Sequence, residues 1–290
     1  MIVPDRPRRS ALYLPASNAK ALAKARTLPA DVVMLDLEDA VAPELKTEAR
    51  AAAVAAVREG GFGPREVAIR ANGLDTPWGA DDLAAIAASG ADAVVVPKIS
   101  TPADILACEA ALASAPPGLQ LWAMIETCTA IGNLFPIAAL AASTRLSLWM
   151  IGTNDLAKEM RAQLTPDRAA FVPLLAQAVC AGRAHGLALL DGVCNEFHDL
   201  DRFRAEAEQG LMLGFDGKTV IHPAQIEPAN AVFSPSPAEL ARAEAIIAAF
   251  ALPENTGKGA IQVNGKMAEL LHLDQARRLV AVAERIAALS

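Results

Sequence analysis

Features that mark several common protein classes are scarce or absent in this chain of 290 residues. Aromatic residues make up 4% of it, and no basic run offsets its formal net charge of −7, which argues against nucleic acid as a partner. No apolar stretch reaches the roughly 18 residues that a membrane-spanning helix requires, so we expect no membrane partner. The basic N-terminal segment MIVPDRPRRS is not followed by the longer apolar stretch of a signal peptide, and we expect none.

Cysteine is also sparse, and its residues lie far apart without a CxxC pair. This spacing argues against a zinc ribbon or a disulfide framework. It fits a protein of the reducing cytoplasm, which is therefore the location that we expect. The cysteines are Cys108, Cys128, Cys180 and Cys194.

The chain is 53% apolar, and its apolar residues gather in eight short runs separated by segments of helical pattern. Each run is continuous rather than alternating, as is typical of parallel strands buried on both faces. Eight alternations of strand and helix predict an α/β fold, the (β/α)8 TIM barrel. The alternative is an open doubly wound sheet, but it usually has fewer strands, and no GxGxxG motif follows the first run. The runs begin at Ala11, Val32, Glu66, Ala93, Leu121, Ser147, Leu187 and Met212.

Helices are predicted between the runs, with the clearest patterns over residues 44–59, 101–115 and 166–186. After Ile226 the pattern changes to a turn, a helix to about Leu252, a polar glycine-rich link and a last helix from about Leu273. We therefore expect a barrel over residues 1–232 and a C-terminal helical extension over residues 233–290.

Polar residues follow most of the runs, at the barrel end where the active sites of this fold lie. Carboxylates predominate, and no histidine ends any of the first seven runs, which favours Mg²⁺ or Mn²⁺ over zinc. Loop carboxylates are often only solvated, so their convergence on one rim matters more than any single one. The residues are Asp36, Glu38, Asp39, Arg70, Asn72, Lys98, Glu126, Asp155, Asp191, Asp216 and Lys218.

Two of these acids, Glu126 and Asp155, follow the fifth and sixth runs directly. Neighbouring strands lie about 4.8 Å apart, so the two carboxylates could share one cation. Mg²⁺ commonly takes one or two carboxylates and completes its coordination with water or substrate oxygens. The alternative for Asp155 is structural, in which it only caps the helix that follows.

Three further side chains have both a chemical and a structural interpretation. Arg70 could bind a substrate carboxylate through its guanidinium, or it could form a structural salt bridge to the acids at residues 36–39. A Schiff-base role for Lys98 requires a lowered pKa, and neighbouring acids would raise it, so we interpret Lys98 as charge-balancing or ligand-positioning. His222, in an Ile-His-Pro turn, is interpreted as structural.

Taken in order, these motifs resemble the CitE-like branch of the HpcH/HpaI aldolase/citrate lyase family. The resemblance covers almost the whole chain and implies a (β/α)8 barrel that assembles as a homotrimer or hexamer. It also implies that the C-terminal extension packs on a neighbouring subunit. The matching stretches are RSALYLPA from Arg9, DVVMLDLEDAVAPELKTEAR from Asp31, IRANGLDTPWGADDL from Ile69, VVVPK from Val94, and then MIET, IGTNDLA and GFDGKTVIHPAQI.

The same resemblance implies roles for individual residues. Glu126 and Asp155 match the family's Mg²⁺ ligands, and Arg70 matches the residue that binds the substrate's oxygens. The substrates of such enzymes are 3-hydroxyacyl thioesters, which are cleaved to an acyl thioester and a 2-oxo acid. The acidic cluster beside the metal corresponds to Asp36, Glu38 and Asp39.

The chain departs from the family pattern near its C-terminus. Members with lyase or synthase activity carry an aspartate there, after a GxM-x turn, which acts as a base over a neighbouring subunit's site. This chain reads GKMAELLHL, and the matching position is Glu269, which has a similar intrinsic pKa but is one methylene longer. Leu270 and Leu271 stand where a proline usually follows. Glu269 is thus a working base, a weakened base or a polar helix-entry residue, and the sequence leaves all three open.

The sequence is compatible with four functions. The leading one is a Mg²⁺-dependent C–C lyase that cleaves a malyl-, citramalyl- or citryl-type CoA thioester to an acyl-CoA and a 2-oxo acid. The alternatives are a thioesterase on the same fold, a citrate lyase β subunit that acts on an acyl-carrier-protein thioester, and an inactive barrel scaffold. Lys20 and Lys24, near the first run, could contact the phosphates of CoA, or each could be a solvated helix charge.

Overall fold

The computed structural model describes residues 6–289, which divide into two compact units. The barrel unit contains Arg8–Phe233, and the C-terminal unit contains residues 234–289 together with Arg6 and Pro7. Residues 1–5 and 290, which complete the N-terminal segment and the predicted extension, lie outside the described range. Within that range no helix is both long enough and apolar enough to cross a membrane.

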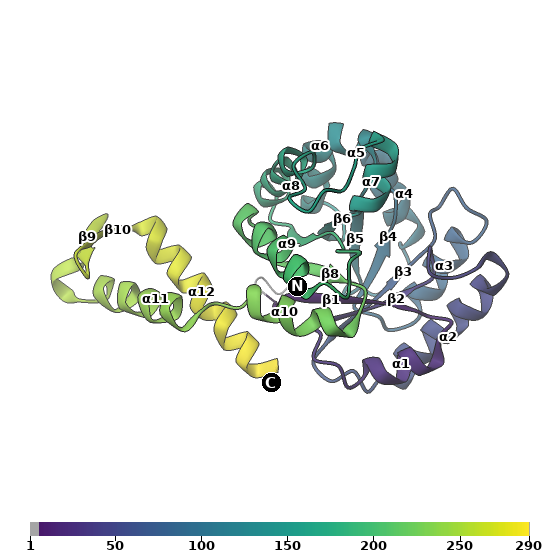
Figure 1. The fold of residues 1–290 in the computed structure, drawn as a ribbon, viewed down its shortest axis with the longest axis horizontal. Helices are drawn as coiled ribbons and strands as arrows, with labels where there is room; N and C mark the ends of the chain where they lie inside the picture. Colours follow the sequence, from purple (N-terminus) through teal and green to yellow (C-terminus); the bar gives the residue numbers. More distant parts are fainter. Residues whose placement is uncertain (1–5, 290) are drawn as a thin grey trace. The chain divides into compact units, whose positions relative to one another are not determined.

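Eight parallel strands of the barrel unit close into a barrel, each paired with its neighbours in chain order (Figure 1). The predicted (β/α)8 barrel is therefore confirmed, and the open doubly wound sheet is excluded because β1 pairs with β8. The strands are β1 (Ser10–Pro15), β2 (Val32–Asp36), β3 (Glu66–Arg70), β4 (Ala93–Val96), β5 (Gln120–Ile125), β6 (Leu146–Ile151), β7 (Ala188–Asp191) and β8 (Gly217–Val220).

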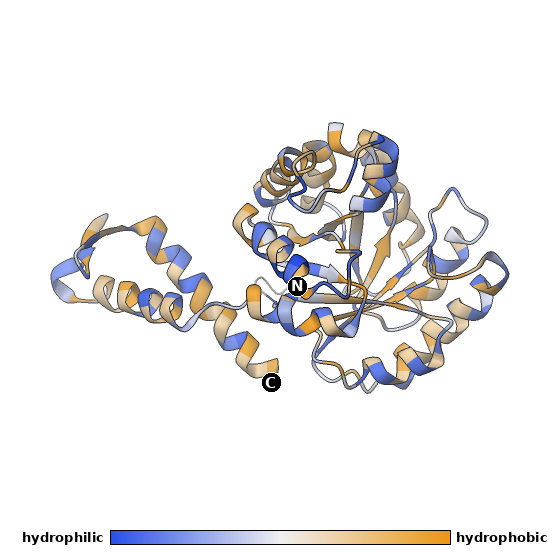
Figure 2. Ribbon diagram, in the orientation of Figure 1, coloured by the Kyte–Doolittle hydropathy of each residue, from blue (hydrophilic) through white to orange (hydrophobic). Residues whose placement is uncertain are grey.

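The strands are apolar on both faces because each face contacts a different core. One set of side chains, including Met34, Trp122 and Leu148, fills the inside of the barrel. The alternate set, including Val33 and Leu121, packs outward against the helices in a larger core. Figure 2 shows the consequence, with mainly apolar strands at the centre of the barrel unit and helices of mixed character around them.

Two of the predicted helices, over residues 101–115 and 166–186, are shorter in the structure, whereas η1 and α2 cover residues 44–59 as predicted. The helix expected over residues 166–186 begins only at Val172, because Arg168 adopts a left-handed conformation (φ 51°). The 101–115 helix begins as predicted, with a capping box between Thr101 and Asp104. The helices are α1 (Ala19–Ala25), α2 (Lys46–Glu59), α3 (Gly79–Ala87), α4 (Pro102–Ala111), α5 (Cys128–Gly132), α6 (Leu134–Ala139), α7 (Thr153–Met160), α8 (Val172–Ala184), α9 (Leu200–Leu213) and α10 (Ile226–Val232), with short 3-10 turns η1 (Pro43–Leu45), η2 (Leu140–Ala142) and η3 (Pro223–Gln225).

The eighth strand was predicted to begin too early. Met212 belongs to the last turn of α9, where its side chain is 80% exposed, and not to a strand. The helix ends at Gly214, whose φ of 100° favours glycine, and β8 starts only at Gly217. A short apolar run that spans a helix end and a strand start cannot be divided by periodicity alone.

The C-terminal unit contains a β-hairpin that the predicted helical extension did not include. Its turn, Asn264 and Gly265, has positive φ at both positions, as a two-residue hairpin requires. The hairpin, α11 and α12 share a small apolar core of their own. The elements are α11 (Pro237–Phe250), η4 (Pro253–Asn255), β9 (Ala260–Val263), β10 (Lys266–Glu269) and α12 (Leu270–Leu289).

A buried charge cluster lies between β7, β8 and α9, outside the barrel lumen. Asp191 accepts hydrogen bonds from Arg168 Nη1 at 2.7 and 2.8 Å and from Lys218 Nζ at 3.0 Å. Glu206 lies 3.6 Å from Lys218 Nζ. The expectation that Asp191 and Lys218 belong to the active-site rim is thus wrong, because both bond to each other away from the cavity. Asp216, another candidate, instead pairs with Arg183 at 2.7 Å.

We predict that Asp191→Asn destabilises the fold by about 3–5 kcal/mol at pH 7, since it leaves two buried cations without their partner. Burial opposes ionisation, but the charges and hydrogen bonds of Lys218 and Arg168 lower the pKa of Asp191. The stabilisation is therefore present above the unfolded-state pKa of about 3.9 and is lost as the pH falls through the lower folded-state value. Urea unfolding at pH 7, about 4 and about 2 measures both effects.

The matched control is Asp201→Asn, also in the α9 region, whose side chain is 97% exposed. It should stay within about 0.5 kcal/mol of the wild type. A loss of under about 1 kcal/mol for Asp191→Asn would contradict the assigned role of the cluster.

Candidate functional site

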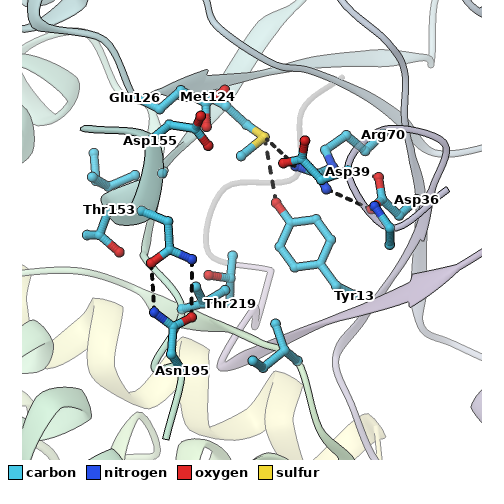
Figure 3. A pocket seen from close by; sticks show the side chains of 16 residues that line it. Tyr13, Asp36, Asp39, Arg70, Met124, Glu126, Thr153, Asp155, Asn195 and Thr219 are labelled. Atoms are coloured by element: carbon cyan, nitrogen blue, oxygen red, sulfur yellow. Dashed lines mark hydrogen bonds and ion pairs between the residues drawn. The ribbon is translucent and has the colours of Figure 1, made fainter. Parts of the chain in front are cut away.

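A cavity of about 330 Å³ opens at the carboxyl ends of the barrel strands (Figure 3). This is the end at which active sites of the fold lie. It brings together residues from six of the strands and the loops that follow them. Its polar lining residues are Tyr13, Asp36, Asp39, Arg70, Glu126, Thr153, Asn154, Asp155, Asn195 and Thr219.

One wall of the cavity is built around the ion pair between Asp36 and Arg70. The two residues end β2 and β3 and are register partners, which sets their side chains next to each other. Arg70 Nε and Nη2 donate to the two carboxylate oxygens of Asp36, each at 2.7 Å. Asp36 also accepts the backbone N–H groups of Glu38 and Ala40 at 2.9 and 3.1 Å. The structure thus contains the salt bridge between Arg70 and the acids at residues 36–39.

The remaining acids of the cluster differ in how they are engaged. Glu38 is buried, and its Oε2 lies 2.7 Å from Arg70 Nη1 without an aligned hydrogen bond from any described residue. Burial raises the pKa of Glu38, and Arg70 opposes that rise. Asp39 lines the cavity with a side chain that is 64% exposed, 3.7 Å from Arg70 Nη1. Asp36 and Glu38 therefore fix the guanidinium, whereas Asp39 faces solvent.

Lys98 links this cluster to the opposite wall. Its Nζ lies 3.0 Å from Glu38 Oε1, and its backbone N–H donates to Glu126 Oε1 at 2.8 Å. The backbone adopts φ 55°, a left-handed conformation that is uncommon outside glycine. Burial opposes the charge, but Glu38, Glu126 and Asp155 raise the pKa of Lys98. This agrees with the prediction that Lys98 balances charge and positions a neighbour rather than forming a Schiff base.

The Glu126 carboxylate is packed directly against the backbone of Gly152. A Cβ at Gly152 would overlap Glu126 Oε2 and lie 2.5 Å from Glu126 Cβ. Burial raises the pKa of Glu126 to about 8, and the nearby charges of Glu38 and Asp155 add to the rise. This site thus holds a carboxylate whose negative charge is only partly compensated by the protein.

Asp155 lies on the same cavity, in the first turn of α7. The N-cap of α7 is Gly152, so the interpretation of Asp155 as the helix cap is wrong. Its position near the helix N-terminus suits a negative charge. Together with Glu126 it forms a two-carboxylate pair at the ends of adjacent strands.

This pair has the chemistry of a Mg²⁺ site. Mg²⁺ takes one or two carboxylates and completes its shell with water and substrate oxygens. Among residues 6–289 no group of three or more histidine, cysteine or acidic side chains is arranged to hold a metal. The raised pKa of Glu126 is also compatible with a bound cation, because a divalent cation would offset the repulsion between Glu126, Glu38 and Asp155.

Several predicted residues lie away from the cavity lining. Asn72 is buried and bonded to Asp82 and Lys46. Lys20 and Lys24 are exposed on α1, which follows β1 at the cavity end of the barrel. His222 Nδ1 accepts the backbone N–H of Ala224 and so caps η3, in keeping with its structural interpretation.

Glu269 belongs to the C-terminal unit, at the end of β10. Its backbone N–H donates to His272 Nδ1 at 3.0 Å. The structure therefore assigns it to a unit separate from the carboxylate pair.

Two features of the cavity were missed by sequence reasoning. Asn154 and Asn195 form a reciprocal amide pair, with hydrogen bonds of 3.1 and 2.8 Å that join the first turn of α7 to the loop after β7. Tyr13 points into the cavity from β1. The signal for Tyr13 was its alternation with Ala11 on the lumen side of β1, but a tyrosine inside an apolar run is most simply interpreted as core.

Comparison with known proteins agrees with this geometry. The model of the family described as HpcH/HpaI aldolase/citrate lyase matches residues 9–223. A (3S)-malyl-CoA thioesterase of Cereibacter sphaeroides is 49% identical over 282 residues, covering 97% of this chain and 96% of that protein. An L-malyl-CoA/beta-methylmalyl-CoA lyase of the same species is 34% identical over 311 residues, covering 98% of this chain and 97% of that protein.

A solved structure is similar over nearly the same length. It is the protein CitE of Mycobacterium tuberculosis, in complex with magnesium, acetoacetate and coenzyme A. The two chains are 28% identical, with a TM-score of 0.76 that covers 96% of this chain and 98% of the other. The resemblance indicated by the sequence motifs is confirmed.

We predict that Gly152→Ala lowers the affinity for Mg²⁺ or Mn²⁺ by roughly 10- to 100-fold, since the new methyl group displaces the Glu126 carboxylate. Isothermal titration with each cation measures the affinity, and thermal melting checks that the barrel stays folded. Gly132→Ala, in nearby α5, is the control, because a Cβ there meets nothing within 4 Å. Equal cation affinity in Gly152→Ala and the wild type would exclude Glu126 as a ligand in this position.

Proposed function

Since this chain belongs to the HpcH/HpaI aldolase/citrate lyase family, we propose that it is a Mg²⁺-dependent thioesterase that hydrolyses a malyl-CoA-type thioester. The observation that carries the proposal is 49% identity with a malyl-CoA thioesterase over 97% of this chain, against 34% with malyl-CoA lyases. The sequence alone favoured the C–C lyase and offered the thioesterase as an alternative. The comparisons favour that alternative.

The reaction requires a water molecule to attack the thioester carbonyl carbon. The C–S bond then breaks, and the departing thiolate takes a proton, so the products are the free hydroxy acid and CoA. Mg²⁺, held by Glu126 and Asp155, would supply positive charge beside the acyl oxygens. Arg70 adds charge from the other side of the cavity, and Asp36 keeps its guanidinium in place.

A carboxylate is needed to accept the proton of the attacking water. We propose Glu269 of a neighbouring subunit for this role, with Asp39 as the candidate within the same barrel. Three exposed apolar side chains of the C-terminal unit support an intersubunit role. Met267, Leu270 and Leu271 are 68%, 52% and 52% exposed. Exposed apolar side chains that gather around one hairpin are typical of a protein interface.

The CoA portion of the substrate has candidate partners on α1. Lys20 and Lys24 are exposed there, at the cavity end of the barrel, and could pair with its phosphates. The complex of Mycobacterium tuberculosis CitE with coenzyme A supports a CoA site in a protein of the same fold. We propose a homotrimer or hexamer as the functional assembly.

The product-resolved test uses malyl-CoA with Mg²⁺. We expect malate and free CoA, and we expect EDTA or Glu126→Gln to lower turnover by at least about 100-fold. Liquid chromatography with mass detection identifies the products. Acetyl-CoA with a 2-oxo acid would instead identify a lyase and reject the thioesterase, and full activity in EDTA would reject the metal.

The intersubunit role of Glu269 is tested by complementation. Glu269→Gln alone should lose roughly 100-fold or more in kcat, the usual contribution of a general base. When Glu269→Gln and Glu126→Gln chains are co-expressed in equal amounts, about a quarter of the sites regain both carboxylates if each site uses two subunits. Recovered activity is the expected result.

Two other results would contradict this role. No recovery in the mixed assembly would mean that Glu269 serves its own chain or none. Full activity of Glu269→Gln, together with a loss of activity in Asp39→Asn, would identify Asp39 as the base.

A further inference from the structure

The hydroxyl of Tyr13 is a polar group of the cavity that the proposed chemistry leaves without a task. Tyr13 comes from β1 and lines the cavity floor beside Met124 and Met150. Its hydroxyl lies 3.1 Å from Met150 Sδ and 3.7 Å from Met124 Sδ, and no other hydrogen-bond partner for it occurs among residues 6–289. Thioether sulfur is a weak acceptor, so this donor can exchange its partner at little cost.

Figure 3 shows where this hydroxyl points. It lies between the Glu126–Asp155 pair on one side and the Arg70–Asp36 pair on the other. The ring supports Arg70, whose guanidinium carbon is 4.9 Å from the ring centroid. The phenol thus reaches the space in which the acyl end of a substrate would be held by charge from both sides.

Arg70, the charged donor of the cavity lining, is already engaged. Arg70 is bonded to both oxygens of Asp36 and paired with Glu38. Burial raises the pKa of Tyr13 above its usual value, so the phenol keeps its proton and remains a neutral donor at neutral pH. The charged groups are suited to a carboxylate, and the neutral phenol is suited to a neutral oxygen.

We propose that Tyr13 is a substrate-contacting residue that donates a hydrogen bond to the hydroxyl oxygen of the acyl group. The inference rests on the proposed function, in which the acyl group is a hydroxy acid. Tyr13 then sets the preference for hydroxyacyl thioesters over those that lack the hydroxyl. A site that pairs a substrate hydroxyl discriminates against an analogue without it, because the site's own polar group loses its partner.

The first test compares malate with succinate, which differ only in that hydroxyl. Isothermal titration in Mg²⁺ gives the dissociation constants for the wild type and for Tyr13→Phe, which removes only the phenolic oxygen. We expect Tyr13→Phe to lose roughly 5- to 10-fold in malate affinity while its succinate affinity stays within about twofold. Equal losses for both acids, or none for either, would overturn the proposal.

The control is Met150→Leu, a volume-conserving change that removes the nearer sulfur acceptor but keeps the phenol. It should retain the preference for malate over succinate. Loss of that preference in Met150→Leu to the same extent as in Tyr13→Phe would show that cavity shape, and not the hydroxyl, sets it.

The second test uses the fact that Tyr13 is the single tyrosine of the chain. Protein labelled with ¹³C at tyrosine Cζ therefore gives one resonance that needs no assignment. We expect malate to shift this resonance and succinate to leave it nearly unchanged. A resonance that responds to neither acid, or equally to both, would overturn the proposal.

Both tests measure binding and are independent of turnover. Failure to hydrolyse malyl-CoA would reject the proposed thioesterase and leave the two binding results interpretable. If the protein hydrolyses malyl-CoA but its tyrosine resonance does not respond to malate, the role of Tyr13 is rejected and the thioesterase activity is retained.

Discussion

The bidentate pair between Asp36 and Arg70 is the interaction on which the cavity depends. Both side chains are buried at the ends of neighbouring strands, so their charges must satisfy each other. The pair sets the turn that carries Glu38 and Asp39, and it holds the guanidinium over Tyr13. The guanidinium is thus held in one orientation by the protein itself.

The fold and the carboxylate pair were readable from the sequence for one reason. A buried parallel strand is a continuous apolar run, and the barrel places whatever follows such a run on one rim. Glu126 and Asp155 follow β5 and β6 and do line one cavity, whereas Asp191 ends β7 but turns outward toward Arg168. Position along the chain gives the end of the barrel, but the alternation of side chains decides which face receives them.

The remaining features depend on contacts between distant residues. The left-handed backbone of Lys98 and the space that Gly152 leaves for Glu126 exist only when β4, β5 and β6 are side by side. The hairpin of the C-terminal unit was missed because its strands, β9 and β10, are only four residues each and partly polar. Short polar strands lack the period that identifies longer ones.

The charge cluster around Asp191 has a consequence for how this sequence can diverge. Exchanging Asp191, Arg168 or Lys218 alone leaves a buried charge without compensation, whereas a well-packed apolar set in place of all of them need not cost stability. The intermediate sequences are therefore the unstable ones. We expect the identities of these residues to change together between related chains, or not at all, although none of them contacts the cavity.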